Sequence, residues 1–429
     1  MKKESITLRI IIIAAIILIL LIPLFMIQSL IEERQAYRDE AIRDVSKGWA
    51  GNQIVSGPVL SVLSSKDEKS NDGKTYTTNL QTNLLPEKLN YDVELVPEKR
   101  YLGIYEIVLY RAKIRLSGVF KTEDLNKAIT GRKIEETFVS FNLSDLRGMQ
   151  KYSQLKWNDS NYNLIAGLKS NSVLNNGFHS IVPVDNANNL DSFEMELLVN
   201  GLDNLEFLPI GKTTEVNVKS SWNNPSFAGA YLPTSRKVNE SGFTAKWTVN
   251  YFNRAFPQIW NENAYKIFPS AFGVKLLVPV DEYQKTMRTS KYGLMIIVLT
   301  FLSFFMIELF GKKVIHPIQY LLIGLALIIF YSLLLAISEY LSFDLSYLIS
   351  ALLVILLISF YVISVYKSTR IGSVIFAALT VFYGLMYTIL QLQDYSLLVG
   401  NIALFVLLAS VMFFTRKINW FDVLNLKIN

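Results

Sequence analysis

Residues 8–27 read LRIIIIAAIILILLIPLFMI, and this stretch decides how the rest of the chain is organised. A helix of about 20 such residues crosses the roughly 30 Å of hydrocarbon in a bilayer. The run exceeds the ~7–15 apolar residues of a cleaved signal peptide, and no small-residue cleavage motif follows it. It continues instead as SLIEERQAYRDEAIRDVSKGWA (residues 29–50), in which Ala41, Val45 and Trp49 recur every fourth residue. We predict an uncleaved transmembrane anchor over residues 1–29 and a helical stalk over residues 30–50.

The C-terminal third of the chain holds further apolar runs of the same length. They cover residues 293–311, 318–338, 346–366, 371–391 and 396–414. Each is long enough for one helix to span a membrane. We predict a bundle of five transmembrane helices over residues 291–416, six spans in total with the anchor, and a cytoplasmic tail over residues 417–429.

Basic residues in the short loops set the orientation of these spans. Lysine and arginine occur at the N-terminus, in the loops at 312–313 and 367–370, and after the last run, whereas the loops at 339–346 and 393–396 contain none. Loops rich in lysine and arginine stay in the cytoplasm. The pattern predicts cytoplasmic termini and places the segment between anchor and bundle outside the cytoplasm.

The segment from residue 51 to residue 290 has the pattern of a β-rich domain. Apolar and polar residues alternate over 139–143, 193–199 and 247–251, which is typical of half-buried strands. Turn signals such as Asn71-Asp72-Gly73 and Asn200-Gly201 separate these runs. We predict a large antiparallel sandwich or a pair of stacked sheets.

Composition excludes several classes of function. The chain has no cysteine, which rules out disulfides, thiolate metal sites and a cysteine nucleophile, and only two histidines. Residues 31–290 carry 31 basic against 30 acidic side chains, so the excess of positive charge lies beside the apolar runs. A nucleic-acid-binding protein would carry that excess on its soluble domain. We expect no nucleic acid, no metal and no cofactor.

Several strings, in order along the chain, resemble one known family. They are Gly57-Pro58-Val59-Leu60, Gly103-Ile104-Tyr105-Glu106, Asp145-Leu146-Arg147-Gly148, Gly177-Phe178-His179 and, from residue 316 to residue 340, HPIQYLLIGLALIIFYSLLLAISEY. This ordered set resembles the inner membrane protein CreD family, described as cell-envelope integrity or colicin-tolerance proteins. The resemblance implies a bacterial inner membrane location, a periplasmic domain and a role in envelope integrity or envelope stress, but no biochemical activity.

Three acidic residues at the ends of the predicted spans are candidate functional residues. Glu308 precedes Lys312 by four residues, which suggests an interfacial ion pair, or alternatively a proton or ion relay. Glu339 and Asp394 fall at the outer ends of the bundle. Acidic side chains at the membrane surface remain hydrated, so placing them there costs little free energy. They are also suited to a cation site or to docking of the periplasmic domain.

Two residues of the β-rich segment complete the candidates. Arg147 follows Asp145 in a predicted turn, where the two are expected to form either a local charged pair or a ligand contact. His179 follows Gly177, and no cluster of histidine, cysteine or acids accompanies it in the sequence, which favours a packing role over a metal site.

These observations favour a non-enzymatic membrane protein. We expect its partners to be the lipid bilayer and an envelope protein or glycan that the β-rich domain binds. A transporter or channel formed by the bundle is the alternative, although the runs hold few polar groups near their centres. An envelope hydrolase using two carboxylates is the third hypothesis, and it needs acids that converge in a cleft.

Overall fold

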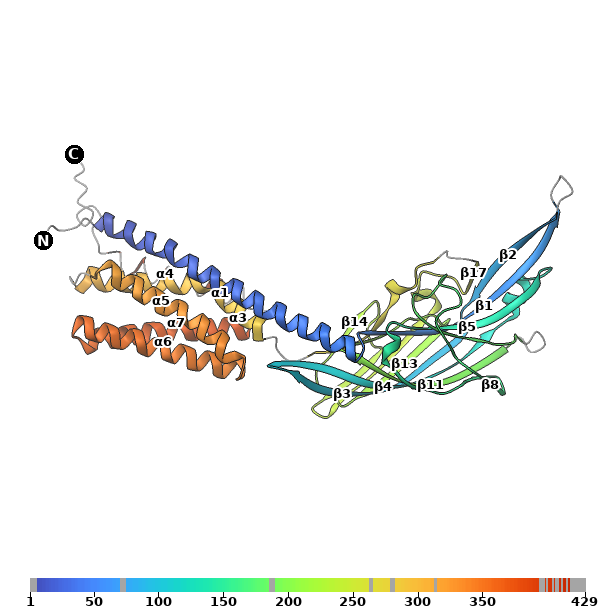
Figure 1. Ribbon diagram of the computed structural model, residues 1–429. Helices are drawn as coiled ribbons and strands as arrows, with labels where there is room; N and C mark the ends of the chain where they lie inside the picture. Colours follow the sequence, from blue (N-terminus) through green and yellow to red (C-terminus); the bar gives the residue numbers. More distant parts are fainter. Residues whose placement is uncertain are drawn as a thin grey trace. The chain divides into compact units, whose positions relative to one another are not determined.

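The computed structural model describes residues 6–69, 75–184, 190–261, 265–277, 282–311 and 315–392, together with single residues between 398 and 416. The chain divides into two compact units (Figure 1). One comprises Met1–Arg38 and Val280–Asn429 and is called the helical unit; the other comprises Asp39–Pro279 and is called the sheet unit.

The anchor and the stalk are one helix. Helix α1 runs without a break from Ile6 to Gly48, 43 residues, and contains Pro23. Its first half is isoleucine- and leucine-rich, and its second half is rich in the good helix formers alanine, glutamate and arginine. The structure thus contains the predicted apolar helix and its charged continuation.

Four helices of the C-terminal region follow the predicted apolar runs: α4 (Gly293–Gly311), α5 (Pro317–Ser338), α6 (Phe343–Tyr366) and α7 (Thr369–Gln391). The polar helix α3 (Glu282–Lys291) precedes them, at the end of the segment that the sequence assigned to the β-rich domain. Four helices in the described residues are long and apolar enough to span a membrane: α1, α5, α6 and α7. The pair α3 and α4, bent by 42°, makes a fifth such segment if it counts as one span. The predicted run at 396–414 and Asp394 lie outside the described residues, apart from single positions.

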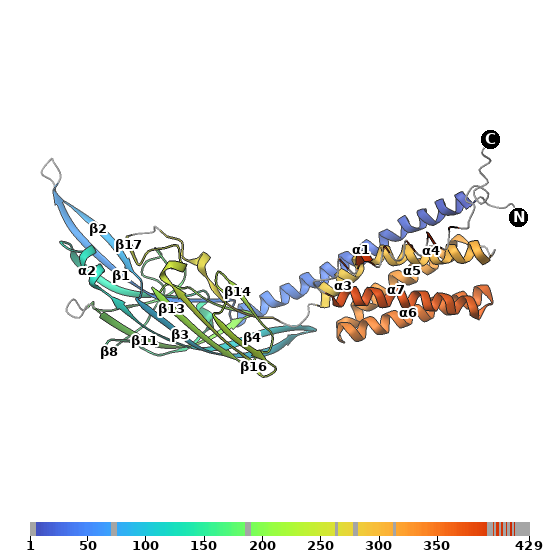
Figure 2. The ribbon, with the colours of Figure 1, turned by 180° about the vertical axis from the view of Figure 1, so that it is seen from behind.

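A cluster of aromatic rings lies in the largely aliphatic interior of the helical unit. Figure 2 shows α5, α6 and α7 running side by side. The rings of Phe330, Tyr347 and Tyr383 meet there, with centroids 5.4 Å apart for Phe330 and Tyr347 and 4.7 Å apart for Phe330 and Tyr383. The Tyr347 hydroxyl donates to the main-chain oxygen of Tyr383 at 2.7 Å, which joins α6 to α7.

The sheet unit consists of two nine-stranded sheets. In sheet A the strand order is β14-β18-β12-β1-β5-β10-β9, with β2 paired to β1 and β17 to β2. Its strands are β1 (Gln53–Lys69), β2 (Thr75–Leu84), β5 (Lys133–Leu143), β9 (Ile165–Ala166), β10 (Gly177–Ile181), β12 (Asn204–Phe207), β14 (Pro225–Gly229), β17 (Ile259–Asn261) and β18 (Phe272–Leu276).

Sheet B has the order β15-β16-β13-β3-β4-β11-β7-β8, with β6 paired to β11. Its strands are β3 (Lys88–Leu102), β4 (Tyr105–Lys121), β6 (Met149–Tyr152), β7 (Leu155–Trp157), β8 (Ser160–Tyr162), β11 (Leu190–Leu202), β13 (Thr213–Ser220), β15 (Ser235–Asn239) and β16 (Gly242–Asn250). A short helix, α2 (Glu123–Ala128), links β4 to β5.

The two sheets share one core, as a sandwich requires. Tyr91 of sheet B contacts Phe207 of sheet A with centroids 5.1 Å apart, and Trp247 of sheet B contacts Phe272 of sheet A at 5.9 Å. The alternation predicted for 193–199 appears along β11, and that predicted for 247–251 holds along β16 as far as Asn250, whereas Tyr251 is exposed in the following 3-10 turn. Residues 139–143 of β5 are all buried, so the alternation predicted there does not correspond to one exposed face.

The prediction of a purely antiparallel domain is wrong in two places. Strand β1 pairs with β12 in parallel, and β13 pairs with β3 in parallel, one such pair in each sheet. Both pairs join strands more than a hundred residues apart, so no turn between the two strands records their direction in the sequence.

Candidate functional site at the stalk junction

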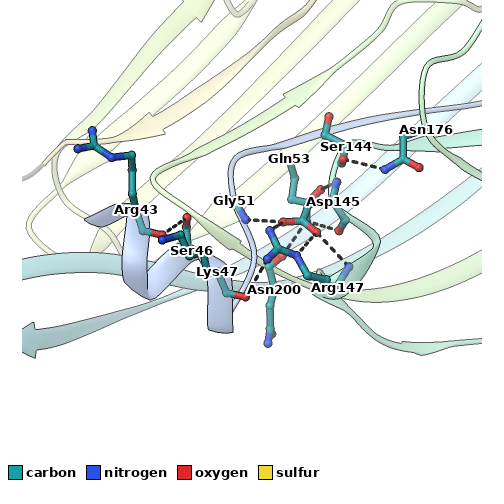
Figure 3. Close-up of polar contacts among 10 residues, drawn as sticks. All are labelled: Arg43, Ser46, Lys47, Gly51, Gln53, Ser144, Asp145, Arg147, Asn176 and Asn200. Atoms are coloured by element: carbon teal, nitrogen blue, oxygen red, sulfur yellow. Dashed lines mark hydrogen bonds and ion pairs between the residues drawn. The ribbon is translucent and has the colours of Figure 1, made fainter. Parts of the chain in front are cut away.

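The side chain of Asp145 connects the end of α1 to the sheets. Asp145 follows β5, has extended dihedral angles and precedes the 3-10 turn η1 (Leu146–Gly148). Its Oδ1 accepts from the main-chain nitrogen of Arg147 at 3.1 Å, which fixes this turn. Its Oδ2 accepts from the main-chain nitrogen of Gly51 at 2.9 Å (Figure 3). One carboxylate therefore holds both its own loop and the chain segment that leaves the stalk.

Arg147 extends this contact to the helix itself. Its guanidinium binds both carboxylate oxygens of Asp145, with Nε 2.9 Å from Oδ1 and Nη2 2.6 Å from Oδ2. The third nitrogen, Nη1, donates at 2.8 Å to the main-chain oxygen of Lys47 in the last turn of α1 (Figure 3). The last carbonyls of a helix have no partner within the helix, and a basic side chain stabilises that end. Arg147 thus caps the stalk.

The charges at this site favour the ion pair. The Arg147 guanidinium and the main-chain N–H groups of Gly51 and Arg147 lower the pKa of Asp145 to about 2. The same contact raises the pKa of Arg147. Because Arg147 is mostly exposed and Asp145 partly buried, water screens part of the attraction between the charges. Asp145 is ionised at any physiological pH.

Gln53 connects the same loop to sheet B. Its fully buried side chain donates through Nε2 to the main-chain oxygens of Asp145 (2.9 Å) and Asn200 (3.1 Å). Its Oε1 accepts from the nitrogen of Asp145 at 3.1 Å. Gly148 lies against this side chain, since a Cβ there would stand 2.5 Å from Gln53 Nε2 and 2.4 Å from the Asn200 oxygen. Three strands, β1, β5 and β11, thus meet at the end of the stalk.

An apolar contact supports the polar one. Ile42, Val45 and Trp49 of the stalk pack against Ile107, Leu109 and Leu202 of sheet B. The guanidinium groups of Arg100 and Arg111 lie over the Trp49 ring at 5.0 and 5.6 Å from its centroid. Val45 and Trp49 are four residues apart in the sequence, and this helical spacing predicted that they share one face of the stalk. We call the polar and apolar contacts together the stalk junction.

The other candidate residues lie elsewhere. Glu308 in α4 is 8% exposed and forms an ion pair with Arg9 of α1, while the Tyr320 hydroxyl donates to it at 3.3 Å. Lys312, the partner suggested by spacing, lies outside the described residues. Glu339 ends α5 and has Arg34 Nε at 3.7 Å from its Oε1. Both contacts are with α1, inside the helical unit.

His179 has a packing environment. It lies in β10, is 9% exposed, and its Nδ1 is 2.7 Å from the main-chain oxygen of Gly167. Its ring meets Phe138 edge-on at 6.4 Å between centroids. Within the described residues, no three histidine, cysteine, aspartate or glutamate side chains gather where they would hold a metal ion.

The fold and the junction define a class of protein. It is a membrane protein in which an N-terminal apolar helix leads into a large two-sheet domain and further apolar helices follow. The family model for the inner membrane protein CreD matches residues 5–421. The inner membrane protein CreD of Escherichia coli strain K12 is 31% identical over 417 residues, covering 94% of this chain and 91% of that protein. The chain belongs to the CreD family.

Proposed function

We propose that the protein supports the integrity of the bacterial cell envelope from the inner membrane. The sheet unit lies in the periplasm and binds an envelope component, and the helices hold it at the membrane with both termini in the cytoplasm. The alternation of basic and non-basic loops supports this orientation. The name of the family supports the membrane location.

The stalk junction is the observation that carries the proposal. A binding domain on a loose linker transmits no force and is free to take any orientation. Here Asp145 and Arg147 fasten the last turn of α1 and Gly51 to the strands, and the Trp49 face adds apolar contact. A binding event on the sheets therefore acts on the stalk without an intervening flexible segment.

The described chemistry supports binding rather than catalysis. The lone histidine of the sheet unit is nine-tenths buried and its Nδ1 is held by a main-chain oxygen. Asp145, with its pKa near 2, is a poor proton acceptor because a general base acts best when its pKa lies near the operating pH. Both side chains serve the fold.

Deletion and complementation test this proposal. Cells without the protein should be more sensitive to detergent or other envelope stress, or altered in colicin tolerance, and the intact chain should restore the normal response. Asp145→Asn, produced at the same level, should restore it incompletely. The proposal fails if deletion changes none of these responses.

One observation favours a transporter as the second candidate. Within the described part of the helical unit, the hydroxyls of Tyr331, Tyr383, Ser350 and Ser359 are buried without a hydrogen-bond partner. Buried polar groups inside a membrane bundle are costly and often mark a solute path. Solute flux in proteoliposomes that is lost in Tyr383→Phe would support this function; no flux of any ion tested would count against it.

A further inference from the structure

The outward face of sheet B carries an open groove that the stalk junction does not use. It encloses about 620 Å³. Residues of β3, β4, β11, β13, β15 and β16 line it, and none of the lining residues is aromatic.

The strand register arranges its charged side chains in two adjacent rows. Residues paired across strands lie on one face about 4.8 Å apart, and alternate residues along a strand repeat about every 7 Å. One row runs through Lys246, Asn217, Asp92, Arg115 and Glu196, and the other through Lys237, Thr244, Lys219, Glu94 and Lys113.

Positive charge is concentrated at this groove. Residues 39–279 hold 27 lysines and arginines against 26 acids, so the sheet unit as a whole is nearly neutral. The groove is lined by six basic residues and three acidic ones. Electrostatic attraction therefore favours the binding of an anion at this groove.

The basic residues are neutralised unevenly. Lys113 and Arg115 share Glu196, at 3.3 and 3.8 Å. Lys246 binds Glu215, at 2.8 Å. On the β13–β15 side, by contrast, Lys219 and Lys237 are exposed and no described carboxylate lies within ion-pair distance of either. The guanidinium of neighbouring Arg236 lies over the Phe227 ring, at 5.8 Å from its centroid.

The shape and chemistry of the groove select a ligand class. Without an aromatic platform, a neutral sugar has no ring to stack on. The two unpaired lysines, Lys219 and Lys237, stand on different strands, β13 and β15, so one small anion does not bridge them as readily as a chain with charges several ångströms apart. Such multiple contacts raise the affinity well above that of a single charge.

We propose that this groove binds a phosphate-bearing polymer of the cell envelope. The inference rests on the proposed function, because it names the component that the sheet unit binds. Lys219 and Lys237 contact the phosphates directly, and the paired cations Lys113 and Arg115 extend the positive surface across the sheet.

Polyphosphate binding by the full chain in nanodiscs of zwitterionic lipid tests the proposal. Fluorescent linear polyphosphate is the probe, and anisotropy gives the Kd. The Lys219→Glu/Lys237→Glu variant should bind at least about tenfold more weakly, with a shallower dependence of affinity on salt. Lys151→Glu/Lys266→Glu is the matched control, because it makes the same charge change at two exposed lysines of the sheet unit outside the groove.

Each outcome decides one point. Equal losses in both variants would mean that only net charge matters and would overturn the proposal. If inorganic phosphate displaces the probe as well as unlabelled polyphosphate does at the same concentration of phosphate groups, the groove does not select a polymer, and the proposal is overturned. Binding of the sheet unit to anionic lipid in nanodiscs, without binding of polyphosphate, would assign the groove to lipid headgroups and would also overturn the proposal. A groove variant that loses polyphosphate yet restores normal envelope sensitivity refutes the ligand class and leaves the envelope role intact.

Discussion

Replacing Asp145 by asparagine should loosen the stalk junction without altering its shape. The substitution keeps the size of the side chain but removes the charge and one of two acceptor oxygens. The carboxylate accepts four hydrogen bonds, two from the Arg147 side chain, one from its main-chain nitrogen and one from Gly51. The amide NH2 group of asparagine then faces donors, and Arg147 keeps its charge without a counter-charge.

The magnitude follows from these contacts. A hydrogen bond to a charged group contributes about 1.5–3 kcal/mol, and partial exposure of this pair reduces the sum. We expect a net loss of about 2 kcal/mol, which corresponds to an approximately thirtyfold rise in the population of the opened junction. Hydrogen exchange measured by mass spectrometry on the full chain should show that rise in peptides covering residues 43–53.

A second carboxylate provides the control. Glu123 in α2 also pairs with two lysines, Lys121 and Lys127, but it does not take part in the stalk junction. Glu123→Gln should leave exchange over residues 43–53 as in the wild type. If Asp145→Asn also leaves exchange there unchanged, Asp145 does not hold the stalk and the reasoning is refuted.

Three further predictions concern the junction and the helical unit. Because the pKa of folded Asp145 lies at about 2, below its usual 3.8, its stabilisation of about 2 kcal/mol after screening is complete above about pH 4 and is lost as the pH falls through 2; the thermal unfolding temperature should therefore fall more steeply between pH 6 and pH 2 for the wild type than for Asp145→Asn. Gly148→Ala should destabilise the sheet unit by about 1–3 kcal/mol, since its Cβ would meet Gln53 and the Asn200 oxygen, whereas Gly48→Ala, with open space around it, should be tolerated in the same denaturant titration. Glu308→Gln should lower the unfolding temperature in detergent, and adding Arg9→Gln should recover part of the loss; a double mutant no better than the single one would show that the pair is not coupled.

Much of the fold could be predicted from the sequence because hydrophobic length and periodicity are local signals. About twenty consecutive apolar residues are removed from water most readily as a helix that spans a membrane. The runs at 318–338, 346–366 and 371–391 correspond closely to α5, α6 and α7. Alternation over 193–199 likewise marked one buried face of β11. The parallel pairs β1–β12 and β13–β3 carry no such local signal.

The site was only half predictable. Asp145 and Arg147 are two residues apart, so their pairing in a turn followed from spacing. Their contacts with Gly51 and Lys47 join positions 94 and 100 residues away, which only the assembled sheets bring together. The sequence analysis did not identify Gln53 as a functional residue. A buried glutamine at the start of a strand looks the same in sequence as an exposed one.

Arg9 shows the same limit inside the helical unit. Spacing along α4 pointed from Glu308 to Lys312, whereas the structure pairs Glu308 with Arg9, 299 residues away in sequence. An arginine next to the start of an apolar run was a usable signal, because a charge in that place needs a partner.

Labelling of single cysteines in intact cells tests the central claim, that the sheet unit lies outside the cytoplasm, most directly. The chain has no cysteine of its own, so each introduced one reports alone. Leu232→Cys in the sheet unit and Thr369→Cys at the start of α7 are both at exposed positions. A maleimide that crosses the outer but not the inner membrane should label Leu232→Cys directly and Thr369→Cys only after the inner membrane is permeabilised. The reverse pattern would contradict the account.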